Sequence, residues 1–150
     1  MLTRRLRLLL RRTHGSATLE TALALIVGIP FCLYAFETCM LTYTEGVIAD
    51  ATRLGVRYAI VHGTDSSNCS GPSKGCADST GTNVQNVVSN NAVISLHNMT
   101  GLVVTVSYPD GTSTPGSHVL VQSSYDYVPY FSMPGIAQTL QAQSEGVIVY

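Results

Sequence analysis

The sequence predicts an α+β protein: a long N-terminal transmembrane helix continues into a small outer domain with a second helix and a three- or four-stranded antiparallel sheet. Three observations predict this class. An apolar segment follows a basic N-terminus, helical periodicity continues beyond that segment, and β-branched stretches occupy the C-terminal third. With 150 residues, the chain allows one modest domain beside the anchor.

The apolar segment follows five arginines, namely Arg4, Arg5, Arg7, Arg11 and Arg12. Because basic residues stay on the cytoplasmic side of a membrane, we predict a cytoplasmic leader over 1–15, a transmembrane helix over 16–43 and an outer domain over 44–150. Spanning a hydrocarbon core of ~30 Å requires residues on both sides of the most apolar stretch. That placement puts Glu20 and Glu37 near the two interfaces.

A cleaved secretory signal is the alternative for this end of the chain. Its basic and apolar parts fit, but the residues after the apolar run, Tyr34-Ala35-Phe36-Glu37, are too bulky for a signal-peptidase site. Nucleic-acid binding by the arginines is a second alternative. The net charge of −1, with only three basic residues from Gly46 onward, argues against it, so we expect no nucleic-acid partner.

Helical periodicity continues after the apolar segment, with apolar residues every three or four positions from Val47 to Val61. We therefore expect the first helix to run on into the outer domain and to end at His62-Gly63, with Gly63 as a left-handed cap. Pro30 is expected to bend this helix.

The remaining elements follow from shorter patterns. A second helix is expected over 83–97 with Thr82 as its cap, and strands over 102–108, 118–127 and 140–150. A sheet of this size needs its apolar face covered. The outer half of the long helix is the expected cover.

The polar loop over 64–81 contains Cys69 and Cys76. We predict a disulfide between them, because they lie on the oxidising side of the membrane and their spacing leaves slack for the bridge. Free thiols and a zinc site are the alternatives, but zinc needs two further ligands and none stands nearby. Cys32 and Cys39 share one face of the span and are expected to be small packing residues.

No motif of a hydrolase, a zinc protease or a phosphate-binding loop occurs in the chain. The four histidines, His14, His62, His97 and His118, are scattered over different elements. We expect no catalytic residue, no metal, no cofactor and no small-molecule substrate. An enzyme whose catalytic groups meet only in the fold is the alternative.

At the start of the span, the basic leader meets Gly15, then Ser16, and Glu20 follows five residues after the glycine. This resembles the processing site of type IV pilins and pseudopilins, which a prepilin peptidase cuts after the glycine on the cytoplasmic face. The resemblance implies a cut that leaves Ser16 as the new amino terminus. Glu20 would then pair with the α-amino group of a neighbouring subunit, because a carboxylate in lipid needs a partner. Alternatively, Glu20 only marks the inner end of the helix.

Over roughly Arg12 to Ile60, the chain resembles the TadE-like family, the minor pseudopilins of the tight-adherence pilus system. The matching pieces are Gly15-Ser16-Ala17 with Leu19-Glu20, the apolar span with its proline, Glu37, and the helix signature Ala51-x-Arg53-x-Gly55-x-Arg57-Tyr58-Ala59. Thr21 stands where the family commonly has an aromatic residue, and Pro30 lies later than is usual. Beyond Ile60 the match is architectural only.

The resemblance implies a minor pilin or pseudopilin that crosses the bacterial inner membrane once, with its N-terminus in the cytoplasm and its outer domain in the periplasm. Its implied partners are the membrane, other pilin or pseudopilin subunits, the pilus assembly platform and prepilin peptidase. The alternative function, from a different class, is a membrane-tethered binding or sensory module, which would need a pocket in the outer domain.

The helix signature also has a physical interpretation. Arg53 and Arg57 are four residues apart and share a face, where Asp50 can pair with Arg53. Gly55 and Ala59 leave a flat strip on which a helix or a sheet can pack closely. The sequence leaves open whether that strip meets a neighbouring subunit or the chain's own domain.

Overall fold

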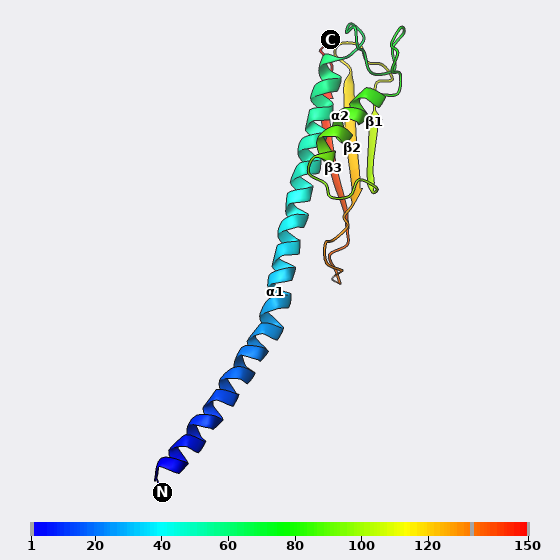
Figure 1. Cartoon of the computed structure of the whole chain (residues 1–150). Helices are drawn as coiled ribbons and strands as arrows, with labels where there is room; N and C mark the ends of the chain where they lie inside the picture. The colour runs from blue at the N-terminus through cyan, green and yellow to red at the C-terminus, as the bar shows by residue number, and fades with distance from the viewer. Residues whose placement is uncertain (1, 133, 150) are drawn as a thin grey trace. The chain divides into compact units, whose positions relative to one another are not determined.

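The computed structural model describes residues 2–132 and 134–149, with side chains from Ser16 onward in those ranges. Its elements, shown in Figure 1, are α1 (Leu2–Val61), α2 (Thr82–Val93), β1 (Leu102–Ser107), β2 (His118–Asp126) and β3 (Thr139–Val147). The α+β class predicted from the sequence is confirmed. The chain divides into two compact units, unit 1 (Met1–Thr38) and unit 2 (Cys39–Tyr150).

Unit 1 consists of the N-terminal part of α1. From Ser16 onward its apolar side chains are largely exposed, as for Leu19 (71%), Ile26 (69%) and Phe31 (73%). From Ser16 onward, α1 is long and apolar enough to cross a membrane; its most apolar stretch has a mean hydropathy of 1.9 and none of it is buried. The helix continues through Pro30, so the missing backbone donor does not end it.

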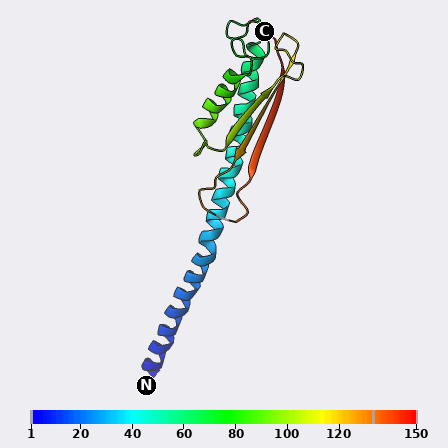
Figure 2. The ribbon, with the colours of Figure 1, turned by 90° about the vertical axis from the view of Figure 1, so that its right-hand side faces the viewer.

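Unit 2 is built on a three-stranded antiparallel sheet in the order β1-β2-β3. Val121 on the central strand pairs with Val106 on one side and with Ser144 on the other. The inward side chains of β2 are buried and alternate with more accessible ones, as a half-covered strand requires. Figure 2 shows α2 and the C-terminal part of α1 beside the sheet, so the expected cover is confirmed and α2 adds to it.

Two glycines allow α2 and β3 to approach α1 closely. A Cβ on Gly55 would lie 2.4 Å from Cγ2 of Val88, and a Cβ on Gly146 would lie 2.6 Å from Cγ1 of Val56. No side chain fits at either point. The flat strip predicted at Gly55 and Ala59 is therefore buried inside the chain's own domain, which decides between the two packings left open by the sequence.

The start of α2 differs from the prediction. Thr82 is the first helical residue and does not cap the helix; the cap position is Gly81, with φ of 76°. The carboxylate of Asp78 instead accepts hydrogen bonds from the backbone N–H groups of Thr82 and Asn83, both at 2.8 Å. The helix also ends at Val93, four residues earlier than expected.

The end of α1 was placed correctly, but its predicted cap was wrong. Gly63 is not among the glycines with positive φ. The backbone N–H of His62 donates to the carbonyl of Ala59 at 3.3 Å, three residues back, so the last turn tightens instead. A left-handed glycine is not needed when the chain leaves a helix in this way.

The last strand begins at Thr139 and ends at Val147, so Ile148 and Val149, which were expected to complete it, lie outside the strand. The N–H of Ile148 donates to the carbonyl of Ser117 at 2.9 Å, and that of Val149 donates to the carbonyl of Ile60 at 2.9 Å. The chain thus leaves the ladder and attaches to the last turn of α1. The first two strands agree with the prediction to within one residue at each end.

Replacing Gly55 by Ala is expected to destabilise unit 2 by about 1–3 kcal/mol, because the new methyl group overpacks the contact with Val88. Gly46→Ala is the matched control: nothing lies within 4 Å of its Cβ position, so it should gain helix propensity of about 1 kcal/mol. Denaturant unfolding of the full chain in detergent measures both. Equal stability of the two variants would contradict the packing described for Gly55.

Candidate functional site

Glu20 is the only charged residue between Ser16 and Phe36, and its side chain is exposed on the apolar surface of unit 1. The neighbouring hydroxyl of Thr21 bonds back to the carbonyls of Ala17 and Thr18, both at 3.0 Å. The threonine is thus satisfied within the helix, as threonines in membrane helices commonly are. Glu20 therefore presents a carboxylate to whatever surrounds the helix.

The predicted cleavage site lies at the edge of the described side chains. The backbone is helical through Gly15 and Ser16, and the Ser16 side chain is exposed. The side chains of residues 1–15, including those of the five arginines, lie outside the described part. Cleavage after Gly15 therefore stays a prediction.

Glu37, the other acid predicted to lie at an interface, is fully buried, whereas the adjacent Phe36 is 48% exposed. Of the two acids between 16 and 43, only Glu20 is thus available on the surface. Cys32 and Cys39 are free thiols and are exposed in the isolated chain, so any packing role for them needs a neighbour.

The residues of the helix signature lie on different sides of α1. Arg53 and Arg57 are exposed, and Nη1 of Arg53 lies 3.2 Å from Oδ1 of Asp50, as predicted. Both side chains of this ion pair are exposed to solvent, so the pair adds little stability. On other sides of the helix, Gly55 is buried and the ring of Tyr58 stacks on that of His62, with centroids 3.9 Å apart.

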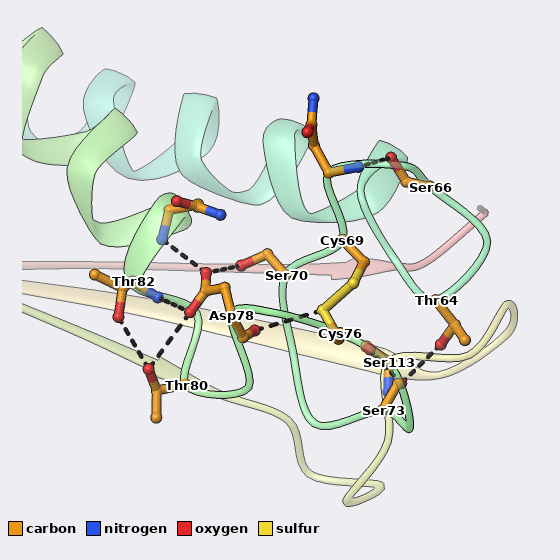
Figure 3. Close-up of a disulfide and its surroundings, with 12 residues drawn as sticks. Thr64, Ser66, Cys69, Ser70, Ser73, Cys76, Asp78, Thr80, Thr82 and Ser113 are labelled. Carbon is orange, nitrogen blue, oxygen red and sulfur yellow. Dashed lines mark hydrogen bonds between the residues drawn. A yellow bond between two sulfur atoms is a disulfide. The ribbon is translucent and has the colours of Figure 1, made fainter.

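The predicted disulfide between Cys69 and Cys76 is present, with the two Cα atoms 5.5 Å apart. Figure 3 shows how hydrogen bonds tie this loop to its surroundings. The Tyr108 hydroxyl donates to the Ser70 carbonyl at 3.1 Å. The hydroxyls of Ser73 and Ser113 are 2.5 Å apart, joining the loop to the β1–β2 connection.

Asp78 is the central residue of this loop, and the sequence analysis missed it. Its carboxylate accepts hydrogen bonds from the Ser70 hydroxyl at 2.6 Å and from the start of α2 (Figure 3). Burial alone would raise the pKa of Asp78, but these hydrogen bonds outweigh it and lower the pKa. The available signal was an acid close before a predicted helix start, since a carboxylate there can accept hydrogen bonds from the unpaired N–H groups of the first turn.

A hollow of about 400 Å³ lies beside the disulfide. Its lining is mostly hydroxyl and amide groups with a single cation, and includes Thr64, Ser66, Ser67, Asn68 and Lys74. A smaller hollow of about 250 Å³ on the outer face of the sheet is lined by Thr105, Gln122 and Gln143 among others. Such linings suit a polar, uncharged or anionic ligand rather than an apolar one.

The described histidines lie in separate places. His62 stacks on Tyr58, the ring of His97 stacks on that of Tyr130 with centroids 4.3 Å apart, and Nδ1 of His118 is 2.9 Å from Oδ2 of Asp110. His14 lies among the residues whose side chains are not described. Within the described residues, no group of three or more His, Cys, Asp or Glu side chains is placed to hold a metal ion.

Comparison with protein-family models, with curated proteins and with solved structures finds no match to this chain. The features that indicate a function are therefore those of the chain itself. They are the exposed apolar helix of unit 1 with the exposed acid Glu20, and the arginine face and disulfide-closed loop of unit 2.

Replacing Asp78 by Ala is expected to cost about 1 kcal/mol of stability at neutral pH, because two backbone donors at the start of α2 lose their partner. A carboxyl with a lowered folded pKa stabilises above its unfolded value, here 3.8, and this contribution is lost as pH falls through the folded pKa. The gap to the wild type should therefore shrink in acid.

Unfolding at a series of pH values measures this gap. Ser79→Ala, at the adjacent exposed residue, is the matched control and should change stability little. A gap for Asp78→Ala that is equally large at neutral pH and below both pKa values would contradict the role given to the carboxylate.

Proposed function

We propose that this chain is a membrane-anchored minor pilin or pseudopilin, a structural or assembly component of a tight-adherence (type IVc-like) pilus, which prepilin peptidase cuts after Gly15. One observation carries the proposal: from Ser16 to Phe36 the helix of unit 1 is apolar and largely exposed, and it bears one exposed acid, Glu20. A simple tether gains nothing from a carboxylate inside the lipid boundary, since ionisable residues there are costly unless paired.

The spacing of Glu20 suits pairing between subunits. After cleavage, the α-amino group would be on Ser16, four residues and thus ~6 Å along the helix axis from Glu20. A neighbour shifted along its axis by about one turn would bring its amine beside this carboxylate. The pair would neutralise both charges in a low-dielectric environment, and a wrong register would leave both unpaired.

Unit 2 would then form the outer part of the subunit. Because Gly55 and Ala59 are used within the domain, contacts of this part with other subunits or with the assembly platform fall to exposed residues such as Arg53 and Arg57. The proposed location is the bacterial inner membrane, crossed once, with the N-terminus in the cytoplasm and unit 2 in the periplasm. Incorporation into a pilus is part of the same proposal.

The hollow beside the disulfide favours a second candidate, a membrane-tethered binding or sensory module. Its hydroxyl, amide and Lys74 groups offer hydrogen bonds to a polar ligand. Crosslinking in the membrane discriminates the two functions, because assembly requires α1 to contact other pilin helices. A tethered receptor would yield no such partners.

Gly15→Ala is expected to abolish shortening of the chain in its native host. Intact-mass measurement should find the wild type beginning at Ser16 and the variant retaining its 15-residue leader. Gly28→Ala, at a helix glycine with nothing within 4 Å of its Cβ position, is the control and should be processed normally. A wild-type chain that still begins at Met1 would disprove the processing step.

Glu20→Ala is expected to leave the protein in the membrane and to abolish its co-purification with other pilus subunits, because the amine of the neighbour loses its counter-charge. Glu45→Ala removes an exposed acid from the same helix outside unit 1 and should assemble normally. Unchanged co-purification of Glu20→Ala would rule out the pairing.

A further inference from the structure

We propose that the described part of the loop between β2 and β3, residues 127–132 and 134–138, lies in the lipid headgroup layer of the membrane that holds α1. Three of its apolar side chains are exposed: Val128 (39%), Tyr130 (47%) and Phe131 (40%). The inference rests on the membrane-spanning part of the proposed function and does not depend on pilus assembly. The partner of this loop surface is the lipid interface.

The packing of unit 2 shows which way β2 runs along α1. Gly146, which pairs with Val119 at the start of β2, lies against Val56 and Ile60 of α1. Farther along β2, the buried hydroxyl of Ser123 is 2.8 Å from that of Thr52. As β2 advances, its contacts on α1 therefore move back toward Cys39, where α1 enters unit 2.

The same contacts give the position of the loop along the axis of α1. A strand rises ~3.3 Å per residue and a helix ~1.5 Å, so the four residues from Ser123 to Tyr127 cover about nine helix residues. Tyr127 therefore lies near the level of Tyr43, and the loop continues beyond it. Figures 1 and 2 both show this loop, in orange-brown, beyond the end of the sheet that lies away from the C-terminus of the chain. Leu41 of α1 packs against the core of unit 2.

The membrane boundary falls at the same level. Counting ~20 residues for a ~30 Å core from Ala17 places the outer limit of the hydrocarbon near Glu37. The headgroup layer adds roughly 5–7 Å, or about four further residues, which extends it to about Leu41. On this proposal, loop residues beyond Tyr127 lie within the depth of this layer.

The composition of the loop fits that layer. No charged residue occurs between Asp126 and Glu145, so anionic lipids would not be repelled. Tyrosine is enriched at membrane interfaces, where its ring sits among headgroups. Tyr43, 53% exposed on α1, adds a second aromatic ring at this level. The contact would seat unit 2 on the bilayer at a defined height.

The chain contains no tryptophan, so single-tryptophan variants of the full chain can report on position in proteoliposomes containing brominated phosphatidylcholine. Phe131→Trp is expected to show blue-shifted emission and quenching by the brominated lipid. Val149→Trp, at a 62% exposed residue near the opposite end of unit 2, should show neither. Phe31→Trp, in unit 1, is the reference for a side chain within the bilayer.

Val128→Trp is a second probe on the same loop and is expected to behave as Phe131→Trp does. If both loop probes are quenched no more than Val149→Trp while Phe31→Trp is quenched, the inference is wrong and the membrane anchor stands. If Phe31→Trp is also unquenched, both the membrane span and the inference are wrong. The two failures are therefore distinguishable.

Discussion

The fold of unit 2 depends on the near absence of side chains where α1 meets α2 and β3. Gly55 faces Val88, Gly146 faces Val56, and Ala59 is fully buried between the helices and the sheet. At such points one added methyl group displaces a neighbour, because protein interiors are close-packed. This constraint fixes how closely the helices and the sheet approach, and it also commits one side of α1 to its own domain.

The rest of the surface of α1 differs between unit 1 and unit 2. From Ser16 to Phe36 in unit 1 the side chains are apolar and largely exposed, and Glu20 is the one exposed charge in this stretch. In unit 2 the same helix is apolar toward the sheet and carries Arg53 and Arg57 on its exposed side. Thr52 contributes one of the buried polar groups of the covered side, and it pairs with the hydroxyl of Ser123. One helix is thus suited to lipid over one part and to a packed domain over the other.

The sequence predicts the features that depend on local pattern. The apolar span, β1, β2 and the Cys69–Cys76 bridge follow from composition, alternation and spacing, and the structure has them. It does not predict features set by distant contacts. β3 ends early because the N–H of Val149 bonds to the carbonyl of Ile60, and Asp78 reaches the start of α2 through a loop closed by the disulfide. For the candidate site, the exposure of Glu20 agrees with its position in an apolar helical span. The burial of Glu37 could not be predicted from the sequence, because it arises only in the folded chain.

The central claim is that the apolar helix of unit 1 stays in the bilayer of the cell that makes the protein. Alkaline carbonate extraction of native membranes, followed by intact-mass analysis of each fraction, tests it most directly. The protein should stay in the pellet, be released only by detergent, and retain the whole segment from Ser16 onward. A soluble product whose first residue lies beyond Phe36 would contradict it.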